Sequence, residues 1–218
     1  MTVAEPRDPR QLRRAARQFA VTLRGEGRPS DRAFDRFLPE PLQGVSPEFW
    51  SPLIVARRAA EWFLEAGVHS VVDVGSGAGK FCVAGALCGT CRFVGLEQRP
   101  FLVKSARALA RLFDVNHRVQ FVLGSLGDVP TPVADAYYFF NPFGDYSVGL
   151  HPRAEDNRAA VAERYARDVA ATDRLLRDVP AGTCLLALNG FGGSLPPGYT
   201  LIRADWNVPG GLRLWRKG

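Results

Sequence analysis

The strongest constraint on this chain is the stretch 71–79, where a short apolar run contains Asp73 and then breaks into three glycines at alternate positions. Lys80 and an alanine-rich apolar segment follow directly. The apolar run is typical of a buried strand, and the segment after the glycines predicts a helix. Glycine is needed between them because the backbone must adopt unusual dihedral angles and let a ligand approach without an intervening Cβ. We therefore expect a nucleotide-like ligand at this turn.

The spacing of the glycines indicates which ligand. A dinucleotide fingerprint, G-x-G-x-x-G, would need its third glycine at position 80, which is Lys80. The acid two residues before the first glycine suits a ligand with an ammonium and a sulfonium charge better than a pyrophosphate. This G-x-G-x-G pattern resembles the first motif of the class I S-adenosylmethionine (SAM)-dependent methyltransferases. The resemblance implies that the following residues contact the methionine end of SAM: Asp73, Gly75, Ser76, Gly77 and Gly79.

Two further strands are predicted downstream. Residues 91–97 read as a strand ending in Glu97, roughly 20 residues after the first glycine, where a carboxylate can accept hydrogen bonds from both ribose hydroxyls. Residues 119–125 form another strand that leads into a turn. The resembled family usually places an acid in that turn for the adenine amino group. This chain has Ser125 there, whose hydroxyl can form one such hydrogen bond. The resemblance implies that Gln98, Ser125 and Leu126 also border the cofactor.

A fourth strand, 134–140, ends in Asn141-Pro142-Phe143. In a doubly wound sheet the first and fourth strands are neighbours, and ligands bind beyond their carboxyl ends. We therefore expect this tripeptide to face the same crevice as the glycine turn. A simpler interpretation is a strand-ending turn, in which asparagine is favoured for its local hydrogen bonds.

The tripeptide resembles the N-P-P-Y/F motif of amino-methyltransferases that act on adenine or glutamine amides. In that family the asparagine oxygen and a proline carbonyl accept the amino hydrogens, and the aromatic ring stacks on the acceptor. This chain lacks the second proline. The glycine turn is also similar to that of the non-SET-domain histone lysine methyltransferases, whose fourth strand ends in an asparagine-containing turn. The resemblance implies a nitrogen acceptor, with Asn141, Pro142 and Phe143 as catalytic residues and Asn141 also beside the cofactor.

Trp50 and Ser51 precede the first strand by one helix. In several amino-methyltransferases a Thr-Pro pair at this place covers the methionine end of SAM, and Ser51-Pro52 resembles it, with Trp50 as a lid. A helix-start turn with a core tryptophan explains the same residues equally well. Residues 144–156, which include His151, are expected to form a loop that gates the acceptor.

The remaining pattern predicts the fold class: α/β, doubly wound, with a mostly parallel seven-stranded sheet and helices on both faces. Amphipathic helices are expected at 10–23, 53–66, from Pro100 onward, and at 153–179. Ser46 is expected to cap a helix that begins at Pro47. Strands are expected at 183–188, 199–204 and 212–215. We divide the chain into an N-terminal helical extension, 1–45, and a methyltransferase domain, 46–218.

Composition narrows the class of protein. The chain has 218 residues, which suits one core, and no apolar run approaches the roughly 18 residues of a membrane helix. No secretory signal core is recognisable, so we expect a cytoplasmic protein. Cys88 and Cys91 form a C-x-x-C pair, but no second pair completes a zinc site, and we expect no metal. The net charge of +6 comes almost entirely from arginine, which is densest before residue 37.

Two alternatives remain open from the sequence. One is an NAD-dependent oxidoreductase on the same type of sheet. The other is a non-catalytic module that binds SAM or nucleic acid, supported by the arginine-rich N-terminus. For the methyltransferase interpretation, SAM is converted to S-adenosyl-L-homocysteine, and the acceptor is a protein, an RNA or a small molecule that the sequence does not identify.

Overall fold

The computed structural model describes residues 8–25, 27–142 and 158–218. Their helices are α1 (Pro9–Arg24), α2 (Asp31–Asp35), α3 (Glu40–Gln43), α4 (Ser46–Phe49), α5 (Leu53–Ala66), α6 (Lys80–Cys88), α7 (Pro100–Leu112) and α8 (Arg158–Asp178). Their strands are β1 (Ser70–Val74), β2 (Arg92–Glu97), β3 (Val119–Leu123), β4 (Ala136–Phe140), β5 (Cys184–Leu188), β6 (Tyr199–Asp205) and β7 (Leu212–Lys217).

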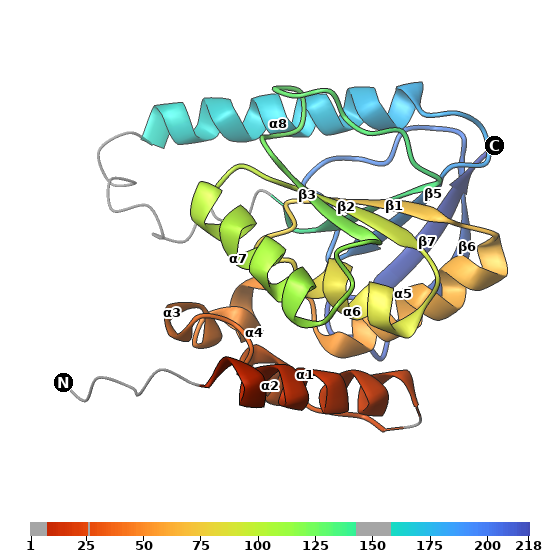
Figure 1. Cartoon of the computed structure of the whole chain (residues 1–218). Coiled ribbons are helices and arrows are strands. Elements are labelled where there is room, and N and C mark those ends of the chain that lie inside the picture. The colour runs from red at the N-terminus through yellow and green to blue at the C-terminus, as the bar shows by residue number, and fades with distance from the viewer. Residues whose placement is uncertain (1–7, 26, 143–157) are drawn as a thin grey trace.

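The strands form one seven-stranded sheet in the order β3-β2-β1-β4-β5-β7-β6. The first five strands in this order run parallel, and β7 pairs antiparallel with both β5 and β6. Strands β1 and β4 lie side by side and run parallel. The strand order along the sheet reverses between these two strands. The predicted fold class is confirmed, and the carboxyl ends of β1, β2 and β4 meet at one edge of the sheet (Figure 1).

Side-chain alternation along the strands builds two cores. Val71 and Tyr138 face one core, whereas Val72, Tyr137 and Phe139 face the other. This period of two is what a strand requires when helices cover both faces of its sheet. The strands are apolar on both sides for the same reason.

The two faces of the sheet are covered differently (Figure 1). On one face α5, α6 and α7 pack against the strands, and α1 and α2 lie beneath that layer. On the other face the long α8 is the main cover. Ala16, Phe34 and Leu38 from the N-terminal helices belong to the same core cluster as α5 and α6. The N-terminal helices therefore share the core of the sheet.

One local prediction is contradicted within the described residues. The predicted Ser46 cap is wrong: α4 begins at Ser46 itself, and no side chain caps it. The Ser46 hydroxyl is used instead as a hydrogen-bond acceptor for Lys80. The helix predicted at 153–179 is observed from Arg158 to Asp178, and residues 153–157 lie outside the described part. Within the described ranges, every helix is too short or too polar to cross a membrane.

Candidate functional site

The glycine turn has the conformation that its sequence predicts. Gly75, Gly77 and Gly79 have φ angles of 79°, 55° and 80°, the left-handed region that favours glycine. Close packing is a second reason for glycine at two of them. A Cβ at Gly77 would lie 2.3 Å from Nε1 of Trp50, and one at Gly79 would lie 2.5 Å from the Phe121 ring. The loop is therefore fixed between β1 and α6 by contacts that no larger residue permits.

Glu97 anchors this loop from the end of β2. Its side chain is 2% exposed, and Oε2 accepts a hydrogen bond from the Gly77 N–H at 3.0 Å. Oε1 accepts from both the N–H and Nε of Arg99, each at 2.9 Å. The carboxylate that the sequence assigns to ribose is thus at the predicted place. The Arg99 guanidinium reaches both carboxylate oxygens, with Nε 2.9 Å from Oε1 and a second nitrogen 3.5 Å from Oε2.

Asp73 is a second buried carboxyl, 3% exposed, inside β1. Burial raises the pKa of this carboxyl to about 7; the hydrogen bond from the Cys82 thiol opposes the rise, and the charge of Glu97 adds to it. The Sγ–Oδ2 distance is 3.2 Å. Cys82 was not singled out from the sequence, because a thiol in an apolar helix carries no signal of its own.

A small cavity of about 20 Å³ lies beside Asp73. Ser51 borders it and shares a 2.7 Å hydrogen bond with the Tyr138 hydroxyl, whose ring stacks on Phe81. Ser76 also borders this cavity, and its buried hydroxyl has no hydrogen-bond partner among the described residues. Several polar groups therefore converge on the cavity. The remaining residues that line it are Phe49, Trp50, Gly75, Lys80 and Phe140.

Trp50 combines the two roles that the sequence left open. It is 7% exposed and belongs to the core, and its indole lies against Gly77 at the border of the same cavity. Trp50 is therefore both a core residue and a neighbour of the glycine turn.

A second cavity, of about 30 Å³, lies on the other side of Gly75. Ser125 donates a hydrogen bond to Oε1 of Gln98 at 3.2 Å, and Arg164 of α8 contacts the same oxygen. Asp168, one helical turn further along α8 and 4% exposed, lines this cavity. It supplies a carboxylate near the turn where the sequence has serine. The other residues around the cavity are Val74, Leu96, Glu97, Gly124, Leu126 and Pro142.

Asp168 and Arg164 were missed in the sequence. Their helix reads as an ordinary amphipathic segment, and no motif marks the turn that reaches the crevice. We call the two cavities and the residues around them the glycine-turn crevice.

The Asn141-Pro142 turn borders this crevice. Asn141 is exposed with a φ of 40°, and its N–H donates to the Gly190 carbonyl at 3.3 Å. Pro142 lies against the glycine turn, since a Cβ at Gly75 would be 3.1 Å from its Cβ. The predicted meeting of these two motifs is observed for Pro142, and the place of Asn141 beside a ligand stays a prediction.

Part of the predicted site lies outside the described residues. Phe143 and the segment 144–156, with His151, belong to this part of the chain. Their predicted contacts with an acceptor stay predictions.

Lys80 is the largest departure from expectation at the site. As the first residue of α6 it is 1% exposed, and its Nζ lies 2.8 Å from Asp31 Oδ1 and 2.9 Å from Asp35 Oδ1. It also donates to the Ser46 hydroxyl at 3.1 Å. The end of the glycine turn is therefore tied to α2 and α4 by a buried ion cluster. The sequence contains one indication of this cluster, the two acids Asp31 and Asp35 one helical turn apart.

The sequence matches no protein-family profile and no curated protein. Solved structures nevertheless resemble this chain. An RNA methyltransferase from Salinibacter ruber, in complex with S-adenosyl-L-homocysteine, aligns with a TM-score of 0.54 at 20% identity. The alignment covers 77% of this chain and 92% of that protein. The fold is that of the class I methyltransferases.

Other solved structures with this class I fold have names that differ from that of the Salinibacter ruber protein. An O-methyltransferase family 2 protein from Planctomyces limnophilus, in complex with apigenin, has a TM-score of 0.56 and 18% identity over 84% of this chain. TrmN from Thermus thermophilus has a TM-score of 0.53 and 16% identity over 77% of this chain. This chain covers 62% and 49% of those two proteins. The shared feature is the fold, and the acceptor differs among its members.

Proposed function

We propose that this chain is a SAM-dependent methyltransferase whose acceptor atom is nitrogen. The observation that carries the proposal is the pair of buried carboxyls, Asp73 and Glu97, on neighbouring strands of a class I fold. Gly75 lies between a cavity beside Asp73 and a cavity beside Glu97. Two separated acids suit a ligand that carries a cationic amino-acid end and a ribose. A pyrophosphate would be repelled by both.

The cavity beside Asp73 is assigned to the methionine end. A ligand ammonium favours the carboxylate form of Asp73, so binding is expected to lower its pKa from about 7. Ser51 and Ser76 offer hydroxyls to the same end, and the Gly77 and Gly79 turn provides the close backbone approach. Trp50 covers this end through its contact with Gly77.

The cavity beside Glu97 is assigned to adenosine. Glu97 accepts the ribose hydroxyls once the Arg99 side chain moves away from it. Asp168 and Gln98 offer acceptors for the adenine amino group, Ser125 adds a hydroxyl, and Leu126 gives an apolar contact. In this proposal, Asp168 takes the part that an acid after β3 has in the resembled family.

Binding requires the crevice to widen. The two cavities are about 30 and about 20 Å³, whereas ligand pockets start at roughly 300 Å³. The side chains that must move are Trp50, which borders one cavity, and Arg99 and Arg164, which contact the lining residues Glu97 and Gln98 of the other. SAM binding is therefore expected to displace the Arg99–Glu97 ion pair.

The reaction needs little beyond orientation. Bound SAM would supply an electrophilic methyl group. The acceptor nitrogen would form its new bond to that carbon as the carbon–sulfur bond breaks with its electrons remaining on sulfur, and the methylated nitrogen would then release its proton to solvent. Holding donor and acceptor in register is worth up to about 7–11 kcal/mol in well-oriented systems. We assign this positioning of the acceptor amino group to Asn141, Pro142 and Phe143, with Asn141 reaching both ligands.

The test has two stages. Calorimetric titration of the full chain with SAM, S-adenosyl-L-homocysteine and NADH is expected to detect the first two ligands only. Methyl-labelled SAM is then incubated with the protein and a cell lysate, which is divided into protein, RNA and small-molecule fractions. Label on nitrogen in any fraction supports the proposal, and the labelled fraction identifies the acceptor class. NADH binding without SAM binding would favour the oxidoreductase, and SAM binding without transfer would favour a non-catalytic module.

A further inference from the structure

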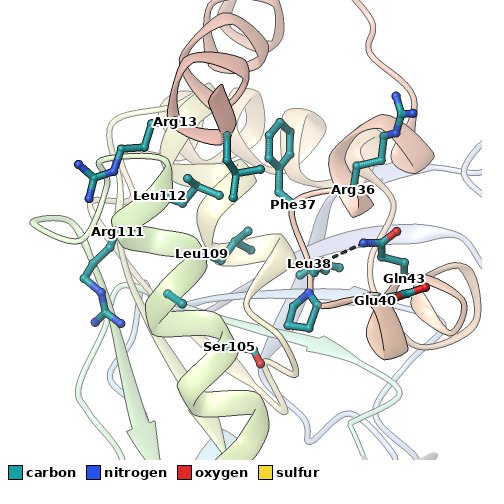
Figure 2. Close-up of a pocket in the computed structure, with 13 residues that line it drawn as sticks. Arg13, Arg36, Phe37, Leu38, Glu40, Gln43, Ser105, Leu109, Arg111 and Leu112 are labelled. Carbon is teal, nitrogen blue, oxygen red and sulfur yellow. Dashed lines mark hydrogen bonds between the residues drawn. The ribbon is translucent and has the colours of Figure 1, made fainter. Parts of the chain in front are cut away.

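Two large cavities lie away from the glycine-turn crevice. A groove of about 650 Å³ separates α1 and the α2–α3 region from α7. Arg13 and Arg111 stand on one side of it and Arg36 on the other, with Phe37 and Leu109 between them (Figure 2). The other residues that line it are Leu12, Leu38, Pro39, Glu40, Gln43, Ser105, Ala108 and Leu112. We call this surface the arginine groove.

The positive charge beside the groove is concentrated on α1. This helix contains five arginines and no acidic residue. At 100° per residue, the arginines at positions 10, 13, 14 and 17 fall within about 100° of the helix circumference, on one face. All four are exposed, and none forms an ion pair with another described residue.

The nearby acids are already committed to structural roles. Asp31 and Asp35 pair with the buried Lys80, and the Asp8 carboxylate accepts the Arg10 N–H at the start of α1. Glu40 is the one acid among the residues that line the groove. The surface therefore keeps a net positive charge, although this part of the sequence contains acids.

The floor of the groove is apolar and includes an aromatic ring. Phe37 is half-buried, borders the groove and contacts Phe19 and Phe113 edge-on. It also borders a second cavity, of about 610 Å³, between α1 and α2. Phe37, Leu12 and Arg36 are common to both cavities, so the hollow surface continues around this helix.

We propose that the arginine groove binds a single-stranded nucleic acid. Arg13, Arg36 and Arg111 line the groove, and the other exposed arginines of α1 extend the positive charge along the helix beside it. This charge matches a polymer with one charge per nucleotide, and bases find apolar and aromatic surface on the floor. A small anion would use only one or two of these arginines and none of the floor. An acidic peptide would satisfy the arginines, but it has no need of a ring for stacking. The proposal goes beyond the proposed methyl transfer and does not depend on SAM.

The test is fluorescence anisotropy of the full chain with labelled 20-residue oligo(U), oligo(dT) and polyglutamate, at 50 and 200 mM salt. The variant is Arg13→Gln/Arg111→Gln. The matched control, Arg92→Gln/Arg174→Gln, removes the same charge from two exposed arginines on β2 and α8. We expect the groove variant to bind the oligonucleotides at least about five-fold more weakly at 50 mM salt, with the control unchanged. The slope of log affinity against log salt should fall by about 1.4, since each lost phosphate contact removes about 0.7.

A second variant separates bases from charge. Phe37→Leu should weaken oligonucleotide binding by roughly five-fold and leave polyglutamate binding unchanged, because only bases stack on the ring. Unchanged polyglutamate binding also shows that the variant is folded. Binding of either oligo(U) or oligo(dT) supports the proposal.

Three results would overturn the nucleic-acid proposal. They are no oligonucleotide binding by the wild type, an equal loss in the control variant, or polyglutamate binding as tightly as the oligonucleotides with no effect of Phe37→Leu. The last result would assign the groove to an acidic peptide. SAM affinity measured on the same variants is expected to be unchanged, so this proposal and the proposed function can fail separately.

Discussion

The glycine-turn crevice and the arginine groove use charge in opposite ways. In the crevice, Asp73, Glu97 and Lys80 are at most 3% exposed, and each has a specific partner. In the groove, Arg13 and Arg111 are exposed around an open apolar floor. The groove has more than ten times the volume of the crevice cavities. Volume alone would therefore select the groove, whereas the proposed active site is where charges are buried, since burial of charge is costly and is retained where a defined ligand or partner repays it.

The largest expected effect is on the stability of the fold and comes from Lys80, whose ion pairs connect the glycine turn to α2. Lys80→Ala leaves Asp35 buried without its cation, and we expect unfolding to become easier by about 3–5 kcal/mol. Chemical denaturation with circular dichroism measures this loss. Lys104→Ala, an exposed lysine on α7, is the control and should be neutral. Lys80→Met/Asp35→Asn should recover part of the loss; no recovery would mean that packing, not the ion cluster, ties the N-terminal helices to the glycine turn.

Glu97→Ala tests the crevice alone. It removes the anchor of the Gly77 N–H and the proposed ribose acceptor, so SAM affinity should fall by about 100-fold or more, whereas oligonucleotide binding in the groove stays unchanged. Calorimetry and anisotropy on one preparation measure both. Gly77→Arg, which would collide with Trp50, should abolish SAM binding as well. Wild-type SAM affinity in either variant would remove Glu97 and the turn from the proposed site.

Asp73→Asn separates binding from stability. The folded pKa of Asp73 is about 7, above its unfolded value of roughly 3.9, so the native state holds the extra proton between these values. Wild-type stability should fall as pH rises from 4 to above 7, and the variant should lack this loss. We expect the variant to unfold at a higher temperature than the wild type at pH 8, with the difference shrinking toward pH 5.

The same substitution should weaken SAM binding. In the wild type, affinity should rise as pH increases through 7, because the carboxylate that attracts the ligand ammonium forms there. In Asp73→Asn the affinity should be about ten-fold lower at pH 8, and most of the pH dependence should disappear. Titrations at pH 6, 7 and 8 measure it. A pH-dependent affinity in the variant equal to that of the wild type would show that another group titrates.

The smallest effect concerns Arg99. Its guanidinium holds Glu97 in place of the proposed ribose hydroxyls, at 2.9 Å. Arg99→Gln should therefore tighten SAM binding by about three-fold, since less of the ion pair has to be broken. Arg92→Gln, at an exposed arginine of β2, serves as the control and should leave affinity unchanged. Weaker binding in Arg99→Gln would mean that Arg99 contacts the ligand and does not compete with it.

The sequence alone predicted the sheet, the glycine turn and the carboxylates of Asp73 and Glu97. These depend on local rules: apolar period along strands, left-handed dihedrals at alternate glycines, and strand ends that parallel pairing brings to one edge. The helical period of the apolar residues also predicted α1 to within one residue at each end, both ends of α5 and the first residue of α7.

The tertiary structure alone decided the partners of these groups. The ion pairs of Lys80 with Asp31 and Asp35 join residues dozens of positions apart. The approach of Asp168 to the crevice does the same. Periodicity has no information on such contacts, because they depend on how helices pack against the sheet. The sequence therefore determined which strand ends carry acids, and the packing of α2 and α8 decided what surrounds them.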